Sequence, residues 1–503
     1  MKIIFKDIDI SSKYEKIIMS MLYLVVTLIT YGMFLRMHYS VDSYSIIYDS
    51  SGTQFLMQGR ILAYVINILF NNIGINLTLH QQIFSLYLII CIAISSTILF
   101  FIIWDQVKNK SFVNWSIVNF SVIISFSNVF FLEWFLYPES TFFFGTSLLC
   151  TVIAIHSISK GQRIINIIVS FLNLMFAMAM YQANLGIFII YSLTICLIRN
   201  KDRLDKAFIK KSIIILSIGF FNSIFNILLL KATIILGIAN KGDRMPSITV
   251  DVIKNNMLGI LKAQKQIWSN GDGFLPKCSL IFFTLIILVV LFKTILKKEN
   301  YKSNICYIVL ILFINYSIIF APHLFTSTLW LAPRTIVGFF IFLVSIILLV
   351  LLYNENNRRI LRVLFLLTSS FIILNIVQIQ NIGVNHIASN KIDRQYALMI
   401  NNEIEKYEMQ NNTKITNIAT SLDMQPTYFY KGIEYAIYDT NIRAFITSWA
   451  DVNIINYYSG GNYNKVEMNS EIYDKYFKGK DWEYFNPSEQ LIFIGDTLYW
   501  CKY

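Results

Sequence analysis

Charge is scarce in this sequence. Asp, Glu, Lys and Arg make up 14% of its 503 residues, whereas soluble domains carry about 25%, and 56% of the residues are hydrophobic. The mean hydropathy is +0.56. Apolar runs of about 20 residues, the length that crosses a bilayer, recur along most of the chain. These features exclude a soluble globular protein and predict a polytopic membrane protein.

The motifs of metal and nucleotide chemistry are also missing. The six cysteines form no CxxC pair, and the five histidines form no HExxH or comparable pair. Neither a G-x-G-x-x-G stretch nor a P-loop is present, which argues against a nucleotide-driven pump. We therefore expect a protein without a metal centre or cofactor. No internal repeat of about 20–50 residues is visible, which argues against a solenoid.

Positive charge is unevenly distributed. The net charge is +12, but residues 379–503 hold 11 basic and 15 acidic residues, so 31 of the 42 basic residues lie before them. This surplus falls in short connectors: Lys108/Lys110, Lys160/Arg163, Arg199–Lys211, Lys293–Lys302 and Arg358–Arg362. The positive-inside rule places these connectors and the Lys-rich N-terminus in the cytoplasm. The charge therefore reports orientation, and we expect no nucleic-acid partner.

Eleven membrane spans are predicted, at residues 17–36, 82–104, 112–132, 141–158, 164–181, 184–198, 212–232, 278–297, 304–321, 335–353 and 360–378. The first has no small-residue cleavage signal behind it, so we expect a retained helix. With the N-terminus inside, an odd number of spans puts residue 379 onward on the outer face. Ile61–Phe70 is apolar but only about half a span long, and we expect it to lie in the interface or to re-enter.

From residue 379 the composition changes to frequent charges and Asn without long apolar runs. Apolar residues at helical spacing predict an amphipathic helix over 385–408. Short β-type runs follow at Lys414–Thr420 and Arg443–Thr447, and a closing pair, Gln490–Ile494 and Thr497–Lys502, is joined as a hairpin by Gly495-Asp496. The fold class is thus an α-helical polytopic membrane protein with a small C-terminal α+β extracytoplasmic domain. Its predicted parts are a membrane domain, 1–378, with outer loops 37–81, 133–140, 233–277 and 322–334, and a domain at 379–503.

The stretch Met37–Arg60 follows the first span and brings Asp42, Asp49 and Arg60 to the outer membrane surface. A carboxylate there stays ionised at the water boundary and still reaches a substrate held in lipid, which suits a general base. Asp42 is closer to the span than Asp49, so its placement is more constrained. The alternative is a solvated loop in which these acids only stabilise turns.

Further polar side chains are predicted on the same face. Glu133 and Glu139 lie between the third and fourth spans, while His323 and Arg334 lie between the ninth and tenth. Carboxylates accept hydrogen bonds from sugar hydroxyls, and Arg holds phosphate with two parallel hydrogen bonds, so the set suits a sugar phosphate. The alternatives are helix caps or ion pairs for the two acids and a snorkelling side chain for Arg334.

The hairpin of spans 164–181 and 184–198 has Tyr181-Gln182-Ala183-Asn184 at its tip. Each helix has about 17 residues, the lower limit for crossing, which leaves the tip below the outer surface. Gln182 and Asn184 then either line a recess or satisfy each other at the turn.

Four stretches together resemble one family, the bacterial type-II membrane glucosyltransferases that decorate O-antigen and related surface glycans. The first is the acid-bearing loop Asp42–Arg60, which closes on Gln-Gly-Arg before a short apolar helix. The others are Asn128–Ser140 with its Phe-Phe-Leu-Glu, the small-residue hairpin Tyr181–Leu185, and the helical segment that begins at Asp393. They run through most of the chain, and their order and spacing together carry the resemblance.

The resemblance implies a GT-C-type architecture and transfer of a sugar, here glucose, from a polyprenyl-phosphate carrier to an acceptor on the outer face. An acid in the first outer loop is the base of this family, and that position is Asp42. Pro138-Glu139 stands where the family pattern has an Asp after Tyr, which leaves the role of Glu139 open. The candidate substrate-binding residues are Arg60, Glu133, Glu139, Gln182 and Arg334.

We expect the protein in the bacterial cytoplasmic membrane. Its expected partners are a lipid-linked sugar donor and a polysaccharide or O-antigen acceptor, with a flippase and a donor-synthesising enzyme as further candidates. Attack opposite the phosphate would invert the anomeric centre. A lipid-linked glycan transporter or flippase, or a polysaccharide polymerase, are the alternative functions. Against a transporter stand the odd number of spans, the polar residues concentrated on one face, and the absence of two matched halves.

Overall fold

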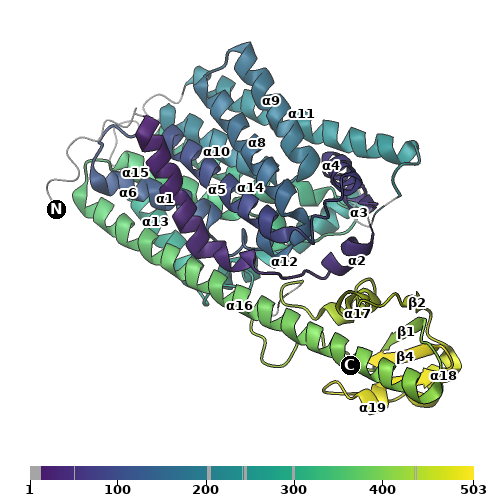
Figure 1. Cartoon of the computed structure of the whole chain (residues 1–503). Coiled ribbons are helices and arrows are strands. Elements are labelled where there is room, and N and C mark those ends of the chain that lie inside the picture. The colour runs from purple at the N-terminus through teal and green to yellow at the C-terminus, as the bar shows by residue number, and fades with distance from the viewer. Residues whose placement is uncertain are drawn as a thin grey trace.

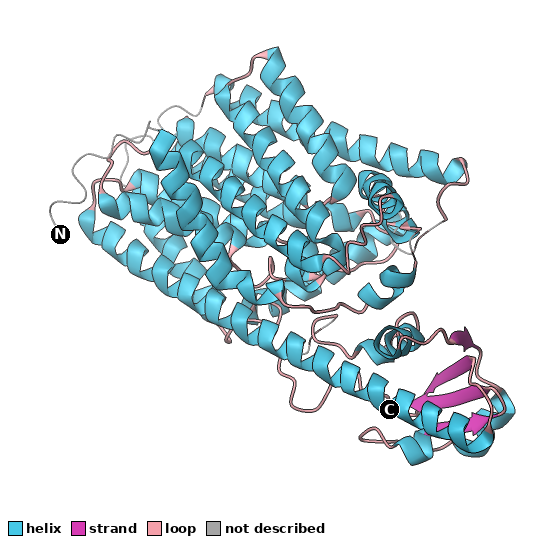
Figure 2. Cartoon of the chain, in the orientation of Figure 1, coloured by secondary structure: helices cyan, strands magenta, loops and turns pink. Residues whose placement is uncertain are grey.

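The computed structural model describes residues 13–49, 51–200, 205–240, 242, 246–247, 249–296, 301–435, 437 and 439–503. A large bundle of helices forms most of the described chain. A small sheet, formed by the C-terminal residues, lies beside the second half of one long helix (Figure 2).

Six helical segments among the described residues are long and apolar enough to cross a membrane. They contain α1 (Lys13–Tyr31), α5 (Gln81–Trp104), α8 (Thr141–Lys160), α11 (Lys206–Ile235), α14 (Tyr301–Leu324) and α16 (Arg358–Asn411). Each coincides with a predicted span, and their length and composition indicate a membrane protein.

The other five predicted spans coincide with shorter apolar helices, so the total of eleven crossings stays a prediction. These helices are α6 (Phe112–Phe126), α9 (Ile164–Met180), α10 (Asn184–Arg199), α13 (Ser279–Ile295) and α15 (Gly338–Tyr353). The half-length apolar stretch after the opening loop forms α4 (Ile61–Asn72), a helix of 12 residues.

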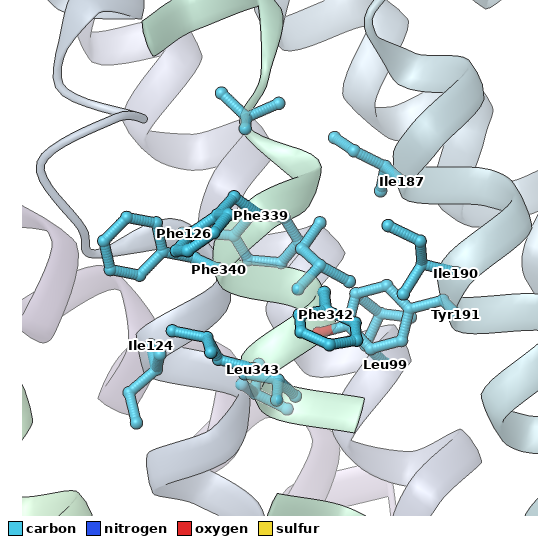
Figure 3. Packing of buried hydrophobic residues seen from close by; sticks show 14 of the residues in the cluster. Leu99, Ile124, Phe126, Ile187, Ile190, Tyr191, Phe339, Phe340, Phe342 and Leu343 are labelled. Carbon is cyan, nitrogen blue, oxygen red and sulfur yellow. The ribbon is translucent and has the colours of Figure 1, made fainter. Parts of the chain in front are cut away.

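The bundle packs around α15. Every residue of this helix except Tyr353 is buried, as expected for a helix that is apolar on all sides. Figure 3 shows side chains of α15 between those of α6 and α10. The labelled residues are Leu99 from α5, Ile124 and Phe126 from α6, Phe339, Phe340, Phe342 and Leu343 from α15, and Ile187, Ile190 and Tyr191 from α10.

Short elements connect the helices at the end of the bundle that faces the sheet. They are η1 (Gly32–Leu35), α2 (Ser43–Tyr48), α3 (Thr53–Met57), α7 (Glu133–Leu136), η2 (Pro138–Ser140) and η3 (Pro333–Thr335). The predicted outer loop 233–277 contains a helix, α12 (Val250–Asn270).

One uninterrupted helix, α16, joins the bundle to the sheet (Figure 1). It has 54 residues and therefore spans about 80 Å at 1.5 Å per residue. The predicted span 360–378 and the predicted helix 385–408 are both parts of it, so the expected boundary at residue 379 falls inside a helix. Gly383 marks a close approach, because a Cβ there would collide with the side chain of Met33.

The C-terminal part is an α+β unit packed on α16. Its four-stranded sheet has the order β2-β1-β4-β3, with β1 parallel to both neighbours and β3 antiparallel to β4. The strands are β1 (Asn417–Leu422), β2 (Asn464–Val466), β3 (Leu491–Ile494) and β4 (Thr497–Lys502), and the helices are α17 (Asp451–Ser459), α18 (Ser470–Tyr476) and α19 (Pro487–Gln490). The predicted closing hairpin is present as β3 and β4.

The strand predicted at Arg443–Thr447 is wrong. This stretch forms a 3-10 turn, η4 (Ala444–Ile446), and its residues are buried in succession, whereas a strand at the edge of a sheet alternates between buried and exposed residues. The guanidinium of Arg443 is buried too, and it donates hydrogen bonds to the carbonyls of Thr427 and Tyr503, each at 2.7 Å. The side chain therefore ties this turn to the C-terminus of the chain.

Candidate functional site

Asp42 lies at the start of α2, where the bundle faces α17 of the C-terminal unit (Figure 1). It is the N-cap residue of α2, yet its side chain makes no capping hydrogen bond. Instead its Oδ1 accepts a hydrogen bond from Nε1 of Trp449 at 3.1 Å. The half-buried carboxylate is thus held between the bundle and the C-terminal unit.

Asn390 of α16 fixes the loop that carries Asp42. Its side-chain oxygen accepts from the backbone N–H of Tyr39 at 2.7 Å, and its side-chain nitrogen donates to the Tyr39 carbonyl at 3.0 Å. A side chain that satisfies both polar groups of one buried backbone unit holds it in place. The long helix therefore sets the position of the chain three residues before Asp42.

Glu139 holds the same loop from the other side. Its Oε1 accepts from Ser40 Oγ at 2.9 Å, and its Oε2 accepts from Ser43 Oγ at 2.7 Å. Ser40 Oγ in turn accepts from the backbone N–H of Asp42 at 3.1 Å. Glu139 is buried, so in this structure it binds the two serines that flank the candidate base.

Glu133 pairs with Arg334. The Oε2 atom of Glu133 accepts from Nη1 of Arg334 at 3.1 Å and from its backbone N–H at 2.9 Å, while Oε1 accepts from Thr440 Oγ1 at 3.2 Å. Both side chains of the ion pair are buried. Burial raises the pKa of Glu133, and the guanidinium of Arg334 opposes that shift.

Arg334 lies between two aromatic rings, with its guanidinium carbon 4.0 Å from the centre of Tyr137 and 4.3 Å from that of Trp330. Its Nη2 is 3.5 Å from Oδ2 of Asp439, a residue of the C-terminal unit. Burial acts to lower the pKa of Arg334, but Tyr137, Glu133 and Asp439 hold it well above its usual range. The guanidinium is therefore charged, and it is buried instead of extending to the membrane surface.

Arg60 reaches the same region through Tyr181. Its guanidinium carbon lies 4.7 Å from the centre of the Tyr181 ring, and the Tyr181 hydroxyl donates to the carbonyl of Arg334 at 2.8 Å. Gln182 donates to the carbonyl of Gln58 at 2.9 Å, two residues before Arg60. Both arginines thus converge on Tyr181, and Gln182 holds the turn that presents Arg60.

The remaining polar residues of the sequence analysis have separate surroundings. Asp49 is exposed, and its Oδ1 accepts from the backbone N–H of Ser51 at 2.9 Å, as in a turn. Asn184 donates to Ser147 Oγ at 2.9 Å and not to Gln182. His323 lies at the end of α14, where Asn256 donates to its carbonyl at 3.1 Å. Among the described residues, no three His, Cys, Asp or Glu side chains are grouped so that they could hold a metal ion.

The six predicted site residues all fall within residues 31–351, and a family model for the glucosyl transferase GtrII family matches that range. The chain belongs to the glucosyl transferase GtrII family. Searches of curated proteins and of solved structures gave no match. The family assignment confirms the resemblance seen in the sequence and identifies the protein as a glucosyltransferase.

Two serines and two residues of the C-terminal unit are among the contributors to this region of the transferase that were not expected from the sequence. Ser40 and Ser43 are ordinary loop residues by composition, and their part appears only through Glu139. Trp449 and Asp439 lie far along the chain from the residues they contact and outside the matched range. No local pattern near Trp449 or Asp439 points to the opening loop or to Arg334.

Proposed function

We propose that this glucosyltransferase moves glucose from a polyprenyl-phosphate carrier to a polysaccharide or O-antigen acceptor on the outer face of the bacterial cytoplasmic membrane. The carrying observation is that a chain of contacts links the loop of Asp42 to two guanidinium groups at one end of an apolar bundle. Arg334 stacks on Tyr137, and Glu139, two residues further on, binds the serines beside Asp42, while Tyr181 contacts Arg60 and Arg334. A lipid-linked donor suits this place because its tail stays in the bilayer while its sugar phosphate reaches the polar groups.

The reaction needs a proton acceptor and a stabilised leaving group. The hydroxyl oxygen of the acceptor attacks the anomeric carbon, and the bond from that carbon to the phosphate oxygen breaks. Its electron pair leaves with the polyprenyl phosphate, and the hydroxyl proton passes to Asp42. Attack on the face opposite the phosphate inverts the anomeric centre.

The arginines supply charge for the leaving phosphate. Arg334 is held in a fixed position by Glu133 and Asp439. Their carboxylates offset its charge, so we assign it a supporting part beside the phosphate. Arg60 is half-buried at the start of α4 and is the side chain that we assign to direct phosphate contact. Gln182 positions it through Gln58.

Consumption of purified polyprenyl-phosphate glucose by the transferase in detergent tests this assignment. Arg60→Lys keeps the positive charge but loses the planar pair of N–H donors, so we expect the KM for the donor to rise about tenfold, the equivalent of 1.4 kcal/mol. Arg163→Lys is the matched control, because Arg163 is also the residue before an apolar helix and is exposed. An unchanged donor KM in Arg60→Lys would remove Arg60 from the phosphate site. No consumption by the wild type would overturn the proposed donor.

The proposed orientation has eleven crossings in a GT-C-type architecture, the N-terminus inside and the C-terminal unit outside. It is supported by the basic connectors and by the five shorter apolar helices at the predicted positions. We expect a reporter that is active only outside the cytoplasm to be active when fused after Tyr503. Activity of a cytoplasm-only reporter at that position would contradict the orientation, and a fusion in the connector 159–163 serves as the cytoplasmic control.

A further inference from the structure

We propose that Trp449 forms an acceptor subsite with Asp42, in which a pyranose ring of the acceptor glycan stacks on the indole face. This inference rests on the proposed function, because it takes Asp42 as the base that receives the acceptor's proton. It goes further by giving the C-terminal unit a direct part in choosing the acceptor.

The exposure of Trp449 sets it apart from the other tryptophans. It is 52% exposed, whereas the other seven, all within the described residues, are buried or half-buried. Single exposed apolar side chains are common on proteins, so exposure alone indicates nothing. Here the exposed ring is also hydrogen-bonded to the candidate base, and exposure together with that bond indicates a binding role for Trp449.

The hydrogen bond fixes how the ring faces the base. Nε1–H donates to Oδ1 of Asp42 at 3.1 Å, so the polar edge of the indole points at the carboxylate. A sugar stacked on the broad apolar face of the ring would hold its hydroxyl groups around that edge. One of them would then lie beside Asp42, which is the geometry that a general base requires. A carboxylate has about four lone-pair positions, so accepting from Trp449 is compatible with taking a proton.

Asp451 stabilises the turn that carries Trp449. This buried residue opens α17, and its carboxylate binds Lys465 at 2.8 Å, Lys502 at 2.6 Å and Thr420 Oγ1 at 2.7 Å. Lys465 also donates to the carbonyl of Ser448. A charged group held by several partners keeps the turn rigid, so the ring is oriented before any sugar binds, which reduces the entropy lost on binding.

Aromatic contacts join α17 to the opening loop next to the subsite. Tyr39 and Tyr457 share a hydrogen bond of 2.5 Å between their hydroxyls, and Tyr44 and Tyr458 share one of 3.1 Å. The four rings pack on one another with centroid distances of 5.0–6.5 Å. These contacts therefore hold α17 against the opening loop and stabilise the position of Trp449 relative to Asp42.

The surroundings favour a sugar over a lipid chain. The residue before Trp449, Ser448, is exposed, and the ring itself donates to the Asp42 carboxylate, so polar groups adjoin the indole. A lipid chain requires a contiguous apolar patch. A pyranose has an apolar face and a polar rim, which match an indole face next to a carboxylate and a hydroxyl.

Steady-state kinetics on the full-length transferase test the subsite, with envelope polysaccharide purified from the native bacterium as acceptor. We expect Trp449→Ala to raise the acceptor KM about tenfold, the equivalent of 1.4 kcal/mol, and to leave the donor KM unchanged. Trp449→Phe keeps an aromatic face but lacks the N–H, so it should restore most of the acceptor KM. Tyr484→Ala is the control, since Tyr484 is an exposed aromatic residue beside α19. A wild-type acceptor KM in Trp449→Ala would overturn the subsite.

Binding without turnover separates this inference from the proposed function. Titrating the polysaccharide in the absence of donor should change the tryptophan fluorescence of the wild type and leave that of Trp449→Phe unchanged. If this difference appears but no glucose is transferred, the subsite is supported while the proposed reaction fails. An equal fluorescence change in both proteins would place the glycan elsewhere and overturn the subsite.

Discussion

Asp42→Asn should lower the rate of glucose transfer by about 10²–10⁴-fold, the contribution typical of a positioned general base. The amide keeps the size of the side chain, and its oxygen can still accept the hydrogen bond that Trp449 donates to Oδ1. The hydrogen bonds from Asn390 and Glu139 involve neighbouring residues of the loop, so the substitution leaves them in place. The measurement is kcat in the purified system, with donor binding as a second readout that should not change.

Asp49→Asn is the matched control for this variant. Asp49 lies on the same loop, is exposed, and accepts at Oδ1 from the backbone N–H of Ser51, which an amide oxygen does equally well. Its rate should stay close to that of the wild type. Near-normal turnover in Asp42→Asn together with an inactive Glu133→Gln or Glu139→Gln would move the base to the segment between α6 and α8.

The second large effect is expected on stability. Glu133→Ala removes the buried partner of Arg334 and takes away the acceptor for its backbone N–H and for Thr440 Oγ1. Breaking a buried pair by removing one member typically costs about 3–5 kcal/mol, because the other charge stays buried. We expect a loss of that size in the free energy of unfolding, measured by denaturant titration in detergent.

Glu403→Ala provides the comparison on a pair of the same type at the surface. Glu403 binds Lys406 at 2.6 Å on α16, where the lysine side chain is 63% exposed. Exposed pairs contribute about 0–1 kcal/mol, so this variant should unfold almost as the wild type does. If Glu133→Ala were no less stable than Glu403→Ala, Arg334 would not depend on Glu133 for its burial.

The sequence was most informative where a pattern is local. Apolar runs placed the spans because membrane helices need them, and the turn of two residues between β3 and β4 predicted the hairpin. Asp42, Arg60 and Arg334 could be selected because charges are rare beside apolar segments. Glu133 could be selected too, but its pairing with Arg334 could not be predicted, since the two are 201 residues apart in the sequence.

The parts that sequence patterns missed depend on contacts between distant segments. Trp449 follows Asp42 by 407 residues, and nothing in its neighbourhood reveals that contact. The stretch Arg443–Thr447 has β-type composition, but tertiary burial decided its conformation, as it often does for short runs. The single helix α16 was divided in two because its composition changes midway while its backbone does not.

Because α16 is continuous, the position of the C-terminal unit relative to the bundle depends on the number of residues in this helix. Adding one residue between Gly383 and Asn390 would rotate everything beyond it by about 100° and advance it by about 1.5 Å. Asn390 would then leave Tyr39, and Trp449 would swing away from Asp42, although no side chain of either contact had changed. The length of α16 therefore fixes both the distance and the rotation of the C-terminal unit relative to the bundle. If the C-terminal unit were replaced by another to alter the choice of acceptor, the number of residues in α16 would have to stay the same.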